Sequence, residues 1–155
     1  MKFFLALAVV LVLFIAIASV TVYAIAATFD NTKIVIGQAL FNIEVAADPI
    51  TQAKGLSWRE SMPEDQGMLF VWRQSGIRYF WMNGMQFPLD FVWINDFKVV
   101  DIDENVPHPA ISGETMRLNS PEPVDMVLEL NAGQIAEQGI KVGDDATYFR
   151  FAASN

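Results

Sequence analysis

The chain has 155 residues, with 18 Asp and Glu against 10 Lys and Arg, and no cysteine. This length suits one domain. The lack of cysteine excludes disulfides, thiolate zinc sites and thiol nucleophiles. The net charge of −8 disfavours nucleic acid as a partner, because phosphate binding needs a basic surface.

The N-terminal stretch differs in composition from the rest of the chain. Residues 3–27 contain no charged side chain, and as a helix they would reach about 37 Å, enough to cross a bilayer core of roughly 30 Å. Lys2 favours a cytoplasmic N-terminus, so we expect a single-pass protein of the cytoplasmic membrane with its domain outside. The alternative is a signal peptide cleaved after Ala26, which would release the domain.

Residues 28–33 are expected to form a linker, and residues 34–155 an extracytoplasmic β-rich domain. Alternating apolar residues predict strands over 33–36 and 40–45, joined at Gly37-Gln38. Asp48-Pro49 predicts the start of a short helix that ends at Gly55.

Strands are also predicted over 67–72 and 78–82, and the second is so apolar that we expect it to be buried on both faces. Residues 91–94 and 98–103 predict a hairpin that turns at Asn95-Asp96.

The C-terminal part predicts strands over 126–130 and 148–151. Between them, Asn131 is expected to cap a short helix that ends at Gly139, with Gln134 in the capping-box position. Residues 105–123 contain four prolines and are expected to be irregular, as a lid, a rim or surface wrapping.

These elements predict a mainly β fold of the α+β type in a single compact domain. It would contain about eight short strands and two short helices, and the strands would form a barrel-like or sandwich sheet. An N-terminal transmembrane helix would precede it.

Aromatic residues are concentrated in one part of the domain. Nine of the fifteen that follow residue 27 lie within 28 residues: Phe70, Trp72, Tyr79, Phe80, Trp81, Phe87, Phe91, Trp93 and Phe97. Large rings most simply build a core, although Trp and Tyr also need partners for their polar atoms and so can line a pocket.

Two carboxylates stand beside apolar strands, Asp90 after Pro88-Leu89 and Glu129 within Val127–Leu130. Burial near a core raises a carboxyl pKa unless the group is paired or hydrogen-bonded. The two could act as the acid and base of a hydrolase. Alternatively, they could pair with Arg59 or Arg78 or accept backbone hydrogen bonds for a structural purpose.

Other polar residues give weaker indications of a functional site. Asp101, Asp103 and Asn105 are oxygen ligands in type, but they lack the glycine turn of a calcium loop, so no metal is expected. His108 is the only histidine, and no Gly-x-Ser-x-Gly elbow accompanies it. No dinucleotide or phosphate-binding glycine motif is present, and no cofactor is expected.

Six segments, in their order and spacing, resemble the family known as domain of unknown function 192: Ala53–Leu56 with Arg59, Gly67–Phe70, Phe80–Met82, Pro88–Asp90, Val127–Gly133 and Gly139–Asp144. The resemblance implies a compact β-rich domain that often follows a signal sequence or anchor, with no established reaction. It also implies a shared polar set of Arg59, Asp90 and Glu129. Many members carry lysine after the Trp-Met pair, where this chain has Asn83.

The leading functional hypothesis is a ligand-binding or envelope-associated module without enzymatic activity. Its ligand, a small molecule or glycan, would contact Trp81, Phe87 and Trp93, with Asp90 and Glu129 fixing polar contacts. The alternative is a glycan-directed hydrolase that uses Asp90 and Glu129 as an acid and base pair. A third hypothesis is a scaffold for another envelope protein, which would show an exposed apolar patch.

Overall fold

The computed structural model describes residues 32–151, in which it contains nine strands and three short helices. The elements are β1 (Thr32–Ile36), β2 (Ala39–Ala46), α2 (Pro49–Lys54), β3 (Gln66–Gly76), β4 (Tyr79–Trp81), β5 (Leu89–Asn95), β6 (Lys98–Val106), α3 (Pro109–Ser112), β7 (Arg117–Asn119), β8 (Val124–Asn131), α4 (Gln134–Gln138) and β9 (Ala146–Arg150). The predicted membrane segment, residues 3–27, lies outside this range. Across 32–151, every helix is too short or too polar to cross a bilayer.

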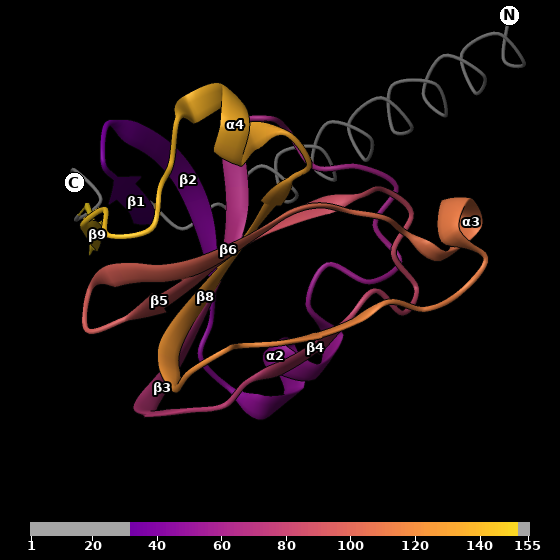
Figure 1. Cartoon of the computed structure of the whole chain (residues 1–155), viewed down its shortest axis with the longest axis horizontal. Helices are drawn as coiled ribbons and strands as arrows, with labels where there is room; N and C mark the ends of the chain where they lie inside the picture. The colour runs from indigo at the N-terminus through magenta and orange to yellow at the C-terminus, as the bar shows by residue number, and fades with distance from the viewer. Residues whose placement is uncertain (1–31, 152–155) are drawn as a thin grey trace, which may run out of the picture. The chain divides into compact units, whose positions relative to one another are not determined.

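Seven strands form one curled, half-barrel sheet in the order β6-β5-β8-β3-β2-β1-β9, and β4 pairs with β7 in a separate two-stranded sheet (Figure 1). The mainly β prediction is therefore confirmed. Strands β2 and β3 pair in parallel, and α2 lies in the connection between them. The curl brings the two ends of the sheet together at an isolated bridge between Lys98 and Asp145.

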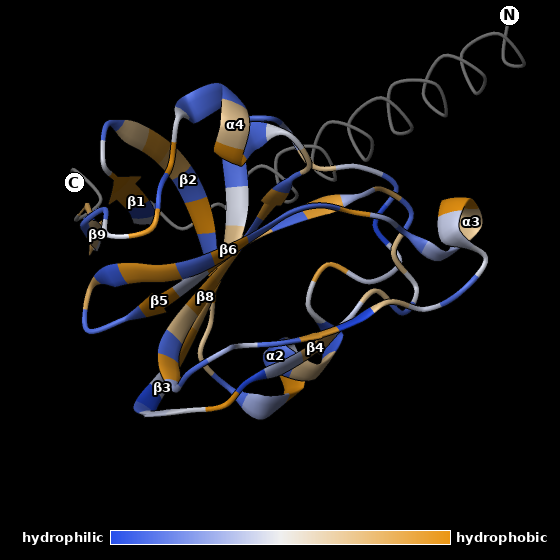
Figure 2. Cartoon of the chain, in the orientation of Figure 1, coloured by the Kyte–Doolittle hydropathy of each residue, from blue (hydrophilic) through white to orange (hydrophobic). Residues whose placement is uncertain are grey.

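Each face of the large sheet carries its own hydrophobic core, because side chains alternate between faces along a strand. One core contains Ile34, Ile43, Leu69, Val92, Leu128 and Ile135, among others. The other contains Leu56, Met68, Phe70, Phe91, Trp93 and Val127, among others. Figure 2 shows the apolar residues concentrated along the strands of the sheet. We call these the α4-side core and the β4-side core.

Local predictions near the N-terminus of the domain are confirmed. Strands β1 and β2 form the expected hairpin, and Gly37 in its turn has a positive φ of 58°. The carboxylate of Asp48 accepts hydrogen bonds from the backbone N–H groups of Ile50 and Thr51, with Pro49 at the first helical position. These contacts fix the start of α2, which lines the site described below.

Two local predictions were wrong. The β5–β6 turn consists of Asp96 and Phe97, with φ of 48° and 60°, rather than Asn95 and Asp96. Strand pairing extends to Asn95, which moves the turn by one residue. The N-cap of α4 is Gly133 rather than Asn131, because Asn131 completes β8 and donates a hydrogen bond to Met62 O.

The stretch predicted to be irregular, 105–123, contains the two elements that the prediction lacked, α3 and β7. Strand β7 pairs only with β4, so the long connection crosses the molecule to complete the small sheet. The prediction of burial for β4 was also wrong, because Tyr79 is 77% exposed and Trp81 is 54% exposed. Only Phe80, between them, packs against the large sheet.

Candidate functional site

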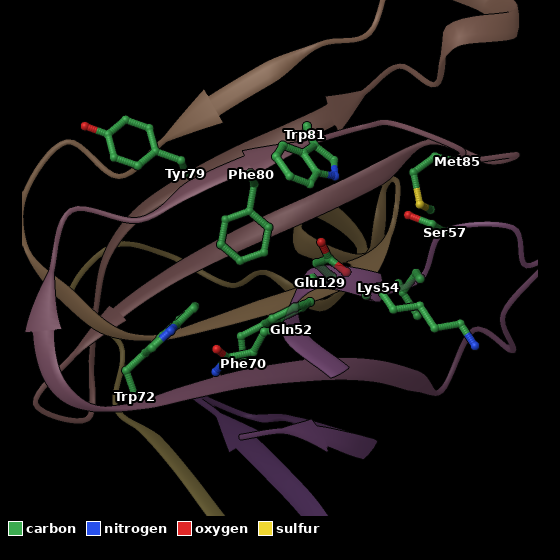
Figure 3. A pocket seen from close by; sticks show the side chains of 13 residues that line it. Gln52, Lys54, Ser57, Phe70, Trp72, Tyr79, Phe80, Trp81, Met85 and Glu129 are labelled. Carbon is green, nitrogen blue, oxygen red and sulfur yellow. The ribbon is translucent and has the colours of Figure 1, made fainter. Parts of the chain in front are cut away.

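A cavity of about 200 Å³ lies between the large sheet, α2 and β4. Most of its walls are aromatic or apolar, and Glu129 of β8 is part of its lining (Figure 3). The side chains that matter for its chemistry are Gln52, Lys54, Ser57, Phe70, Trp72, Tyr79, Phe80, Trp81, Met85 and Glu129. We call it the Glu129 pocket.

The aromatic wall is held together by Phe80. Its ring packs edge-to-face on Phe70, with the ring centroids 4.9 Å apart, and on Phe91 and Trp93, each at 5.6 Å. Phe80 thereby fixes β4 over the sheet. Side chains alternate between the two faces of a strand, so Trp81 does not point the same way as Phe80. Trp81 lines the mouth of the pocket and stays largely exposed.

Glu129 faces the β4-side core because of strand register. It pairs with Met68 on β3 and with Phe91 on β5, both of which belong to that core. The side chain is only 5% exposed, and its Oε2 is buried without a hydrogen-bond partner among the described residues. In Figure 3 its carboxyl group lies among the labelled lining side chains, close to Phe80 and Trp81 in the view.

Burial raises the pKa of Glu129 from its ordinary value of 4.5 to about 8, and the positive charge of Arg59 opposes part of this rise. The cause is desolvation, which disfavours the charged form of a carboxyl group. At neutral pH the carboxyl group of Glu129 is therefore largely protonated, which is rare for carboxyl groups in proteins.

Arg59 reaches Glu129 only through its electric field. Its guanidinium makes a bidentate ion pair with Glu44 of β2, at 2.5 Å for Nη1–Oε1 and 2.8 Å for Nη2–Oε2. Glu44 stands opposite Met68 and so lies in the same row across the sheet as Glu129. The predicted pairing of Glu129 with an arginine is thus replaced by pairing of that arginine with a second glutamate.

Two other polar side chains of the pocket donate hydrogen bonds to the backbone. Gln52 Nε2 donates to the backbone carbonyls of Ala46 and Val71, and Ser57 Oγ donates to the carbonyl of Asn83. In Figure 3 the ammonium group of Lys54 points away from Glu129. Among the lining side chains of residues 32–151, Glu129 is the one with a buried oxygen that has no hydrogen-bond partner.

Asp90 does not belong to this pocket. It pairs with Leu130, one position along from Glu129, and its side chain faces the opposite core. Its Oδ1 accepts from the backbone N–H of Asn105 at 2.7 Å and its Oδ2 from that of Ile135 at 2.9 Å. Asp90 is a fully buried structural anchor for β6 and α4, and the expected acid and base pair with Glu129 is not assembled.

Of the three predicted aromatic contacts, only Trp81 lines the pocket. Trp93 is fully buried, and its Nε1–H donates to Asp103 Oδ2 at 2.7 Å. Phe87 is half-buried against the β4-side core and lies outside the lining. The structure therefore places neither Phe87 nor Trp93 in the lining of this pocket.

Phe70, Trp72, Phe80 and the residues of α2 line the pocket, although none of them was predicted to contact a ligand. A signal was present for two of them, since Phe70 and Trp72 fall on one face of their strand at a spacing of two. Recognising that they share a face with Glu129 requires the β3–β8 register, which the sequence alone does not supply.

A second, more open hollow of about 340 Å³ lies between β6 and β7. Asp103, Glu104 and Asn105 contribute to its lining, but Asp103 is engaged with Trp93. Within residues 32–151, His, Asp and Glu side chains nowhere gather in threes as a metal site would require. His108 precedes α3 as its N-cap residue and makes no side-chain capping bond there.

Comparison with known proteins gives one family and two solved structures. The model of the family DUF192, described as "Uncharacterized ACR, COG1430", matches residues 32–148. No curated protein matches the chain.

Both solved structures are bacterial. A protein of Sinorhizobium meliloti 1021, described as a "putative transcription regulator", is 32% identical over 77% of this chain and 95% of its own, with a TM-score of 0.68. A protein of unknown function from Novosphingobium aromaticivorans DSM 12444 is 29% identical over 74% of this chain and 83% of its own, also with a TM-score of 0.68.

Proposed function

Because this chain belongs to the uncharacterised DUF192 family, we propose its function from the site itself: the domain binds a small ligand in the Glu129 pocket. The observation that supports this proposal most is the carboxyl group of Glu129, which is buried and lines a cavity, and whose Oε2 has no hydrogen-bond partner within residues 32–151. An unpaired buried polar group destabilises a fold, so its presence inside a pocket favours a role in binding.

The size and lining of the pocket agree with this proposal. Ligand sites are typically concave and mostly apolar, with a few polar groups that orient the ligand. Here the rings of Phe70, Phe80 and Trp81 would contact a flat or apolar ligand surface. Glu129 would supply the oriented polar contact.

A hydrolytic function has less support. The glycan-directed hydrolase required two carboxyl groups on either side of one bond. Asp90 and Glu129 face different cores, and both oxygens of Asp90 are held by backbone N–H groups. Nor do we extend the regulator description of the Sinorhizobium protein to this chain, whose 18 acidic residues against 10 basic ones disfavour DNA binding.

The test is a ligand panel read out by nuclear magnetic resonance of the tryptophan indole N–H groups. The chain has four tryptophans, and Trp81→Ala would assign the signal of the pocket residue. We expect sugars, amino acids or small amines to shift the Trp81 signal, and Trp81→Ala to weaken binding at least tenfold.

Trp58→Ala is the matched control, because Trp58 is 72% exposed and lies outside the pocket lining. Its affinity for the same ligand should stay within twofold of wild type. A panel that leaves the Trp81 signal in place throughout, or equal losses in both variants, would overturn the proposal.

We also propose that the domain acts outside the cytoplasmic membrane, tethered by residues 3–27. The support is the uncharged length of this segment and the placement of Lys2 before it. Protease added to intact spheroplasts should degrade the domain, and the full-length chain should fractionate with membranes. Cleavage after Ala26 would instead give a shorter, released protein, and protection from protease would contradict the external location.

A further inference from the structure

In the Glu129 pocket, a carboxyl oxygen that can accept a hydrogen bond is surrounded by aromatic rings. We infer that the pocket selects a small organic ammonium ion, a primary or secondary amine carrying a ring or short apolar body, whose N–H groups bind Glu129. This inference rests on the proposed function and specifies its ligand class.

The first reason is that no donor group within residues 32–151 forms a hydrogen bond with Oε2 of Glu129. Its Oε2 is buried and has no partner in the described part of the chain, whereas the donors of Gln52 and Ser57 are already used by backbone carbonyls. A ligand that brings N–H donors would satisfy this oxygen. A ligand that brings only acceptors could bind the O–H of the protonated form, but it would gain no ion pair with the carboxylate.

The second reason is the character of the walls. Ring faces carry a negative quadrupole and attract cations within about 6 Å. Trp72 already accepts the guanidinium of Arg78, which lies 4.3 Å from its ring centroid. Among residues 32–151 no cationic side chain lies over the ring of Trp81, which lines the same pocket.

The third reason is charge balance around the carboxyl group. The charged or titratable side chains near it are Arg59, Glu44, Lys54 and Tyr79, while Asp90 faces the other core. The guanidinium of Arg59 is bound to Glu44, so it acts on Glu129 only through its charge and makes no direct contact as a counter-ion. The chain as a whole carries a net charge of −8, which draws cations toward the domain.

The volume of the pocket limits the size of the ligand. An engineered apolar cavity of about 150 Å³ is known to hold benzene. The Glu129 pocket, at about 200 Å³, therefore has room for one six-membered ring with an aminomethyl group.

The inference makes a thermodynamic prediction about protons. The free pocket holds a protonated carboxyl group with a pKa of about 8, and an ammonium ion binds its ionised form. Each bound cation therefore releases one proton to solvent below that pH. Affinity should weaken by roughly tenfold for each pH unit below the pKa of Glu129.

The experiment compares benzylammonium with its uncharged analogue, benzyl alcohol, by calorimetry in buffers of different ionisation enthalpy. At pH 6.5 we expect nearly one proton released per benzylammonium bound, and at pH 8 we expect at least tenfold weaker binding of the alcohol than of the ammonium ion. Glu129→Gln should lower the affinity for benzylammonium at pH 8 by more than tenfold, whereas the exposed Glu122→Gln should not change it. Circular dichroism would establish that both variants fold.

Different failures point to different proposals. If the alcohol binds as tightly as the ammonium ion and no proton is released, the ammonium inference is wrong and the pocket's binding function stands. The same holds if neither probe binds but a sugar shifts the Trp81 signal. If no probe and no panel ligand shifts that signal, both proposals are overturned.

Discussion

Asp90 and Glu129 occupy adjacent register positions on the neighbouring strands β5 and β8, yet their carboxyl groups project from opposite faces of the sheet. Asp90 accepts hydrogen bonds from two backbone N–H groups, whereas Oε2 of Glu129 has no partner among the residues that the structure describes. Two carboxylates that look alike in the sequence therefore have different roles. Asp90 stabilises the fold, and Glu129 is available to a ligand.

This division predicts a stability effect of Asp90→Asn that leaves binding intact. The amide would turn an N–H₂ group toward one of the two backbone donors, so that a buried hydrogen bond is lost. We expect the free energy of unfolding to fall by about 2–3 kcal/mol. Urea titration would measure it, and a ligand affinity changed more than threefold in the folded variant would contradict the separation of roles.

Glu129→Gln is expected to change how stability depends on pH. The pKa of Glu129 is about 8 in the folded chain and near 4.5 when unfolded, so the folded state binds more protons between these values. Stability of the wild type should therefore fall as pH rises from 5 to 8, by at most about 1.4 kcal/mol per pH unit.

The glutamine variant cannot ionise, so its unfolding free energy should lack this component. Relative to wild type it should gain stability steadily between pH 5 and pH 8, as measured by urea unfolding at several pH values. Parallel pH profiles for the two proteins would show that the carboxyl group is ionised in the folded state.

Arg59→Met is expected to raise the pKa of Glu129 further. The substitution removes the positive charge that now favours ionisation of Glu129, and it leaves Glu44 without its partner. Carbon-detected titration of the Glu129 carboxyl group would measure the shift. Arg73→Met, on an exposed residue of β3, serves as the control and should leave this pKa in place.

Two glycines of β3 allow a matched test of packing beside the site. A β-carbon at Gly67 would lie 2.8 Å from the backbone oxygen of Glu129, whereas one at Gly76 would meet Arg78 no closer than 3.6 Å. Neither glycine has a positive φ. We expect Gly67→Ala to destabilise the domain by about 1–3 kcal/mol through overpacking.

Gly76→Ala should stay within about 0.5 kcal/mol of wild type, since its new methyl group has ordinary contacts. Thermal unfolding of both variants would make the comparison. Equal losses would mean that strand propensity, rather than the contact with Glu129, sets the cost.

Sequence patterns predicted the local structure well where a few neighbouring residues decide it. Asp48-Pro49 marks the start of α2, and Gly37 marks the first turn. They failed where distant pairing decides the outcome. Strand β4 is apolar enough to suggest full burial, yet its only partner is β7, nearly forty residues later, so Tyr79 and Trp81 face outward.

The site shows the same limit. Trp81 and Glu129 were recognised from composition and context, and both line the pocket. Trp93 was also chosen, but its alternation on β5 points it into the core, where Asp103 satisfies its indole N–H. To tell the pocket residues from the core residues, one must know the register of β3, β5 and β8. A shift of one residue in the pairing would move each side chain to the opposite face of the sheet.

The curl of the large sheet has a consequence for behaviour at high concentration. Beside the Lys98–Asp145 bridge, Val99 N–H donates to Asp144 O and Ala146 N–H donates to Phe97 O, so the outermost strands satisfy each other's backbone groups there. Exposed strand edges are the usual templates for intermolecular β-pairing and fibril growth. Because the sheet closes on itself at this point, these backbone groups are not available to pair with a strand of a neighbouring molecule.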